Sequence, residues 1–285
     1  MSEREVTHVI PSERHVEGAG FVVRRPFPTI RVDHVDPFLL LDEMGPVTLG
    51  PGQAQGAPDH PHRGFETVTY LIEGEAEHED SAGHRGTLRA GDVQWMTAGR
   101  GVIHSEMPSA RMRREGGRMH GFQLWVNLPA RDKMMAPRYQ ELAAASIPSA
   151  SSDDGLARVK VIAGEALGAK ASIETRTPIL YQHWSLSRGA DVRVLVPEGY
   201  EVMAYVFAGR ARLGGRAIGE GELAVMGPGD AVRLAADERA ELLLLGGVPL
   251  REPVARYGPF VMSTREQILT AITDFQSGRF GEIAR

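Results

Sequence analysis

Cysteine is absent from the 285-residue chain. Its absence excludes disulfide bonds, thiolate metal sites and a cysteine nucleophile, so any transition metal must be held by histidine and carboxylate. Long apolar runs are also missing, because no stretch approaches the ~20 apolar residues of a membrane span. The charged first five residues lead into no apolar core and so do not form a secretory signal. These absences predict a cytoplasmic protein without a membrane partner.

An excess of positive charge is missing as well. The chain has 32 Lys and Arg against 37 Asp and Glu, a formal net charge of -5, and therefore does not attract phosphate backbones as a whole. One basic cluster is interrupted by glutamate and glycines, and we interpret it as a solvated loop. It contains Arg111, Arg113, Arg114 and Arg118. We expect no direct binding of nucleic acid.

The chain is rich in turn-forming residues, with 33 glycines and 18 prolines, and has few amphipathic helical periods. This favours an all-β fold with tight turns. TVTYLIEG (67–74) and GDVQWMTAG (91–99) are paralleled by VMAYVFAG (202–209) and GELAVMGPG (221–229). We interpret the parallel as an internal duplication. It predicts two tandem barrel domains, residues 1–140 and residues 141–285.

Two short segments concentrate side chains of the metal-ligand type: HPHRGFE (60–66) and GRGVIHSE (99–106). His60 and His62 are two residues apart, as are His104 and Glu106, so in extended strands each pair points to one face. If the two strands face one another, four ligands converge. Imidazole nitrogens with one carboxylate suit Fe(II), Mn, Ni, Cu or Zn better than calcium or magnesium. The sequence therefore predicts a transition-metal site.

The second half of the chain carries apolar residues where the first half carries these ligands. When the two halves are superposed, the corresponding residues are Leu195, Pro197, Leu234 and Ala236. The one histidine of this half, His183, has no potential ligand near it in the sequence. We expect a structural second barrel without a metal.

Several residues near the ligands have open roles. Gln123 and Trp125 share one face of a predicted strand, so either can contact a substrate, or Trp125 can be a core residue. Arg63 and Arg100 flank the ligands and can clamp an anionic substrate or form structural salt bridges. The acids considered as partners are Glu66, Asp42 and Glu43. Three further histidines are expected to be solvent-exposed non-ligands: His78, His84 and His120.

A terminal helix of about three turns is predicted near the end of the chain. Ser263 and Glu266 form a potential capping box, and Gly278 is the predicted stop. Apolar residues follow at helical spacing, and we expect this stripe to dock on the sheet. They are Ile268, Leu269, Ile272 and Phe275.

Three motifs resemble the pirin family of the cupin superfamily: HPHRGFETVTYLIEG, GDVQWMTAGRGVIHSEMP and GGVPLREPVARYGPFVMST. The match extends over nearly the whole chain, from residue 17 to residue 281. The resemblance implies a bicupin with one metal, usually iron, in the N-terminal barrel. Carried over by position, its ligands are His60, His62, His104 and Glu106. Glu66 competes with Glu106, because the general cupin pattern places a ligand glutamate a few residues after His-x-His, but the pirin resemblance favours Glu106.

The resemblance implies two functions of different classes. One is a quercetinase (quercetin 2,3-dioxygenase), in which a flavonol binds the metal through its 3-oxygen and the ring is cleaved by O2 with release of carbon monoxide. Its cofactor would be Fe(2+), with Mn, Ni, Cu or Zn as alternatives, and Glu106 would be both ligand and general base. The other is a non-enzymatic, iron-binding, redox-responsive regulatory protein that binds transcription factors or metabolic enzymes.

Overall fold

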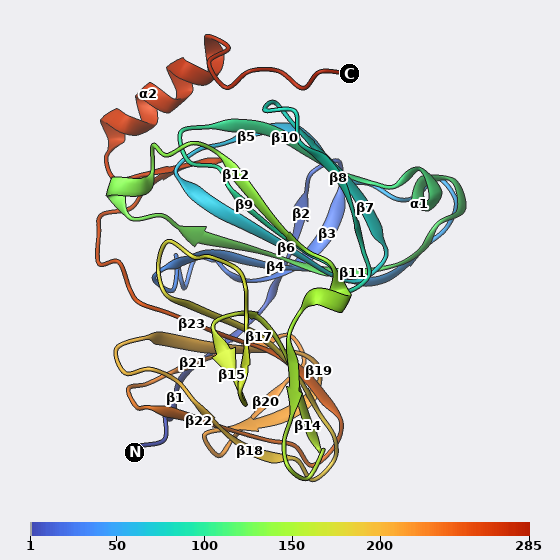
Figure 1. Ribbon diagram of the computed structural model, residues 1–285, viewed down its shortest axis with the longest axis vertical. Coiled ribbons are helices and arrows are strands. Elements are labelled where there is room, and N and C mark those ends of the chain that lie inside the picture. The colour runs from blue at the N-terminus through green and yellow to red at the C-terminus, as the bar shows by residue number, and fades with distance from the viewer. Residues whose placement is uncertain (1) are drawn as a thin grey trace. The chain divides into compact units, whose positions relative to one another are not determined.

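The computed structural model describes residues 2–285 and consists mainly of β-sheet, which confirms the all-β prediction (Figure 1). It forms two compact units. We call the N-terminal barrel unit the one that contains Arg14–Pro28, Phe38–Ala145 and Arg251–Arg285. The C-terminal barrel unit contains the chain up to Glu13, Thr29–Pro37 and Ser146–Leu250. No helix among the described residues is long and apolar enough to cross a membrane.

The N-terminal barrel unit has two sheets, ordered β12-β9-β6-β11-β4-β3-β2 and β5-β10-β7-β8. The strands of the first are β2 (Glu13–Glu17), β3 (Phe21–Phe27), β4 (Phe38–Leu49), β6 (Phe65–Glu73), β9 (Val93–Thr97), β11 (Gly117–Asn127) and β12 (Arg138–Leu142). Those of the second are β5 (Ala57–His62), β7 (Glu75–Asp80), β8 (Arg85–Arg89) and β10 (Val102–Pro108). The unit also contains α1 (Ala110–Glu115), the hairpin of β24 (Ala255–Tyr257) and β25 (Phe260–Met262), and α2 (Arg265–Gln276). One-turn 3-10 helices are η1 (Ala130–Asp132) and, at the boundary of the units, η2 (Ala144–Ser146).

The C-terminal barrel unit is built on one ten-stranded sheet and the small pair β15-β16. Its strands are β1 (Val6–Pro11), β13 (Ser149–Ser151), β14 (Ala157–Ala163), β15 (Glu165–Ala166), β16 (Ala169–Lys170), β17 (Ile179–Leu186), β18 (Asp191–Leu195), β19 (Glu201–Leu213), β20 (Arg216–Gly219), β21 (Glu222–Met226), β22 (Ala231–Ala235) and β23 (Ala240–Gly247). Alternating residues of these strands form a large buried core of Val, Leu and Ala around Trp184. Leu234 and Ala236, at the positions expected to lack ligands, belong to this core.

The duplication read from the sequence is visible in the strand pairing. In the N-terminal barrel unit Tyr70 of β6 pairs with Val93 of β9. In the C-terminal barrel unit the corresponding Tyr205 of β19 pairs with Leu223 of β21. The register differs at the expected ligand positions, because Leu195 pairs with Ala231 whereas His60 pairs with His104.

The compact units do not follow a single cut of the chain at residue 140. Near the N-terminus β1 pairs along β21, from Val6 opposite Met226 to Pro11 opposite Glu222. Near the C-terminus residues 251–285 return to the N-terminal barrel unit. The N-terminal segment therefore belongs to the C-terminal barrel unit, with which it pairs through β1. The C-terminal segment belongs to the N-terminal barrel unit.

The terminal helix forms as expected, but its cap lies one residue later. Thr264, rather than Ser263, is the N-cap, and its capping-box partner is Gln267. Ile268 is buried against the hairpin of β24 and β25, while Leu269 is 56% exposed and Phe275 37% exposed. The predicted apolar stripe is thus only partly docked.

Candidate metal centre

Three imidazoles converge in the N-terminal barrel unit. His60 and His62 lie at the end of β5, and His104 lies opposite His60 on the neighbouring β10. One potential ligand atom from each lies within 4.8 Å of the others, and this is the only such group of three or more found in the described part of the chain. The prediction that the two segments bring their histidines together is confirmed.

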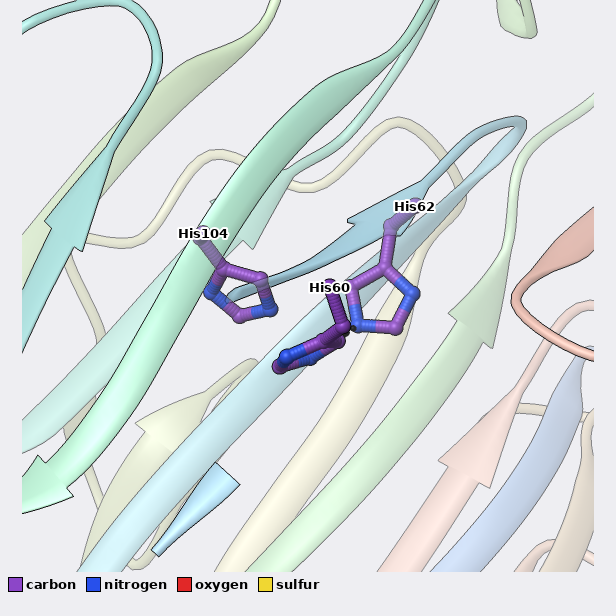
Figure 2. Close-up of side chains that lie close together, drawn as sticks. All are labelled: His60, His62 and His104. Carbon is purple, nitrogen blue, oxygen red and sulfur yellow. Dashed lines mark hydrogen bonds between the residues drawn. The ribbon is translucent and has the colours of Figure 1, made fainter. Parts of the chain in front are cut away.

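The ring orientations suit a shared metal ion. Figure 2 shows the three rings close together, with one nitrogen of His62 and one nitrogen of His104 directed toward the His60 ring. The Nε2 atoms of His60 and His62 are 3.1 Å apart. Two nitrogens that each lie about 2.1 Å from one ion have this separation when the angle at the ion is near 90°. His60 Nδ1 donates to the carbonyl oxygen of Pro58 at 2.7 Å, which leaves Nε2 unprotonated in the neutral ring and available as a ligand.

Burial keeps two of the three histidines in the neutral form that can bind a metal. Burial lowers the pKa of His62 well below its ordinary value, and the neighbouring His60 adds to the effect. Burial lowers the pKa of His104 in the same direction, with smaller contributions from His62, His60 and His78. Both imidazoles are therefore neutral at pH 7, and a metal ion there does not compete with protons.

Glu106 lies two residues beyond His104 on β10, but its carboxylate is not part of the three-histidine group. It reaches across to the other sheet of the unit. Its Oε1 is 2.7 Å from the Thr69 hydroxyl on β6, and its Oε2 accepts a hydrogen bond from Gln123 Nε2 on β11 at 3.2 Å. Gln123, whose role was open, therefore contacts the glutamate predicted as fourth ligand.

Glu66, the competing glutamate, is held elsewhere. Its side chain is buried, at 1% exposure, and accepts a hydrogen bond from the Thr97 hydroxyl at 2.6 Å.

Trp125 packs beside the histidines, with its ring centre 5.2 Å from that of His62 and 4.3 Å from that of Phe65. Trp125 therefore belongs to the packing around the three histidines.

Arg63 is a structural residue, and its partner is not one of the acids considered from the sequence. Its guanidinium donates to Asp274 of α2 at 2.8 Å and to the backbone oxygen of Arg100 at 2.6 Å. Arg100 itself is exposed. The expected acids pair with other arginines, since Asp42 binds Arg25 and Glu43 binds Arg24.

The expectation of three exposed non-ligand histidines is wrong for two of them. His78 is 2% exposed and His120 is 6% exposed, and each binds a carboxylate, Glu141 and Glu43 respectively. His84 is half-exposed. The missed signal was the alternation at the end of β7, where His78 and Asp80 are buried while Glu77 and Glu79 are only partly buried.

We call residues 63–64, which connect β5 to β6, the ligand loop. The buried Lys133 connects this loop to residues 251–285, the C-terminal segment of the chain. Lys133 Nζ donates to the backbone oxygens of Gly64 (2.8 Å) and Val261 (3.1 Å) and to Asn127 Oδ1 (2.6 Å). Burial lowers the pKa of Lys133 to about 8. The loop that follows His62 is thus held by an amine whose charge is costly to bury.

The lowered pKa of Lys133 predicts that the free energy of unfolding rises at alkaline pH. Between pH 8 and about 10.5 the unfolded chain binds a proton at Lys133 that the folded chain does not, so the free energy of unfolding increases with pH, by about 3 kcal/mol over the window. Urea unfolding between pH 7.5 and 10.5 measures it. Lys133→Met should remove this increment and Lys170→Met, at an exposed site, should keep it; equal pH slopes in all three proteins would contradict the assignment.

Two tandem β-barrels, one of which brings three histidines together, define a bicupin with a site for a divalent metal cofactor. The models of two families match: Pirin over residues 20–126 and the Pirin C-terminal cupin domain over residues 181–281. The chain belongs to the pirin family.

Relatives and solved structures agree with this membership. Pirin of Mus musculus is 44% identical over 98% of this chain and 95% of its own length. A pirin-like protein of Solanum lycopersicum is 43% identical over 93% of this chain and 89% of its own. The crystal structure of a quercetin 2,3-dioxygenase from Acinetobacter baumannii superposes with a TM-score of 0.94 and 38% identity, covering 99% of this chain and 100% of that one. The similarity thus extends over both barrels.

Proposed function

We propose that this protein is a metal-dependent dioxygenase that acts on flavonol-type substrates such as quercetin, with iron as its metal. The observation that carries the proposal is the convergence of three imidazoles, one of which, His104, lies two residues from Glu106 on the same strand. The similarity to a quercetin 2,3-dioxygenase over the whole chain supports the substrate class. His60, His62, His104 and Glu106 would hold the ion. The ion would supply Lewis acidity and redox chemistry toward O2.

Within this proposal Glu106 is the general base that takes the proton of the flavonol 3-hydroxyl. Its surroundings suit both protonation states. The Thr69 hydroxyl lies 2.7 Å from Glu106 Oε1 and 2.6 Å from Gln123 Oε1, yet it carries a single proton. It can donate to the ionised Glu106, or accept from the protonated Glu106 and donate to Gln123. Proton uptake at Glu106 therefore leaves no buried polar group unpaired.

The substitution Glu106→Gln tests this role. An amide cannot accept the flavonol proton, and general-base catalysis contributes about 10²- to 10⁴-fold, so we expect turnover of quercetin to fall at least about a hundredfold while three histidines still bind metal. The matched control is Glu66→Gln, at the buried glutamate bound by Thr97, which should keep most of the activity. If Glu66→Gln loses turnover and Glu106→Gln does not, the assignments are reversed.

The activity itself is measured after anaerobic loading with Fe(II), followed by quercetin and then air. We expect metal-dependent loss of the flavonol absorbance with stoichiometric uptake of O2 and release of carbon monoxide. Absence of turnover with quercetin, while quercetin still perturbs the iron spectrum, would refute the dioxygenase. It would favour the regulatory alternative, for which the affinity of a protein partner must differ between the ferrous and ferric forms.

A further inference from the structure

His78, the histidine of β7, forms a hydrogen bond through only one of its two ring nitrogens. His78 is 2% exposed, and its Nε2 lies 2.8 Å from the carboxylate of Glu141, which also accepts from Gln94. Its Nδ1 is buried without a hydrogen-bond partner. Because an ionised carboxylate only accepts hydrogen bonds, Nε2 carries the proton. In the neutral ring Nδ1 is therefore an unused acceptor.

The unused acceptor faces the strand that carries the metal ligands. The Nε2 edge of the His78 ring lies against Gly86 of β8, where an added Cβ would come within 2.5 Å of Nε2. The Nδ1 edge is the opposite one, and the strand on that side of β7 is β10. His78 pairs directly with Glu106, so His104 is its diagonal neighbour at about 7–8 Å between Cα atoms.

His104 also has a buried ring nitrogen without a hydrogen-bond partner, and this nitrogen needs an acceptor when the ring binds a metal. One nitrogen of its ring is directed toward the His60 ring (Figure 2), and its Nδ1 is buried without a partner. When Nε2 binds an ion, the proton of the ring resides on Nδ1, which then needs an acceptor. Asp80, which pairs with His104 across the strands, already receives hydrogen bonds from the backbone of Ala82 and from His84.

We propose that His78, oriented by Glu141, is the outer hydrogen-bond partner of His104, joined to it through one ordered water. The inference rests on the metal centre proposed above. The water accepts from His104 Nδ1 and donates to His78 Nδ1, which satisfies both buried nitrogens. The chain His104, water, His78, Glu141 fixes the tautomer of His104 and strengthens it as a ligand. His78 is thus a positioning residue.

The substitution His78→Phe tests the proposal, because it keeps a ring against Tyr139, which stacks on His78 at 5.6 Å, and removes the acceptor. We expect nickel(II), measured by competition with a chromophoric chelator, to bind about ten- to a hundredfold more weakly, the usual effect of losing an outer partner. His78→Gln, which retains an acceptor, should recover most of this loss. His84→Phe, on the same hairpin, is the matched control and should bind nickel as the wild type does.

A spectroscopic readout separates positioning from a loss of packing. In the cobalt(II)-loaded protein each ligating histidine gives a paramagnetically shifted, exchangeable N–H proton signal. His78→Phe should lose one such signal through fast exchange with water, and His78→Gln should retain it. Equal nickel affinity and an unchanged set of signals in His78→Phe would overturn the inference and leave the metal centre intact. A wild type that binds no nickel would instead overturn the metal centre itself, and this inference with it.

Discussion

His60→Ala is expected to weaken nickel(II) binding by more than about a hundredfold and to abolish every metal-dependent activity. The reason is that it removes one of only three imidazoles in the group, whereas loss of an outer partner alone costs about ten- to a hundredfold. His60 is the least buried of the three, so its truncation should disturb the barrel least. Chelator competition measures the affinity, and the melting temperature of the metal-free protein reports on the fold.

The control for this prediction is His183→Ala in the C-terminal barrel unit. His183 bonds to Glu241 at 3.0 Å and lies in the unit that has no group of converging ligands among its described residues. Its removal should leave nickel affinity unchanged. A wild-type affinity in His60→Ala would show that the three histidines are not the metal site.

Arg63→Met should lower the free energy of unfolding by about 3 kcal/mol, the lower end of the range for breaking a buried ion pair. The side chains of Arg63 and Asp274 are 5% and 10% exposed, and the guanidinium also lies 4.6 Å from the centre of the Phe280 ring. Urea unfolding at pH 7 measures the loss. The cost is moderated because Asp274 retains a second partner, Arg279.

The pH dependence of this difference gives a second check. The hydrogen bond from Arg63 contributes most to holding the pKa of Asp274 below its ordinary value, so the stabilisation is present above pH 4 and is lost as the pH falls through the folded-state pKa. The difference between wild type and Arg63→Met should therefore shrink in acid. Arg100→Met, at the exposed arginine, should change stability by less than about 0.5 kcal/mol; equal losses at both sites would refute the structural role.

The ligand histidines and the duplication were predictable from the sequence because both depend on short-range spacing. A separation of two residues places His60 and His62, or His104 and Glu106, on one face of any extended strand. The repeated strand and turn pattern likewise predicted the duplication, and in the structure Tyr205 pairs as Tyr70 does. These features need no knowledge of distant contacts.

The features that were not predictable depend on distant segments. Nothing near Arg63 in the sequence indicates Asp274, which is 211 residues away. The burial of His78 depends on its position between β8 and β10, while its immediate neighbours are all charged or small. Glu106, the predicted fourth ligand, is a related case, since the sequence placed it near the histidines but could not show that Thr69 and Gln123 bind its carboxylate.

The return of residues 251–285 to the N-terminal barrel unit has a consequence for biosynthesis. Lys133 holds the ligand loop partly through Val261, and Arg63 holds it through Asp274. A ribosome that has released only the first half of the chain has not yet made either contact. The ligand loop therefore reaches its final form only when translation is nearly complete, and a gene fragment ending at residue 140 would encode the three histidines without the segment that fastens the loop next to them.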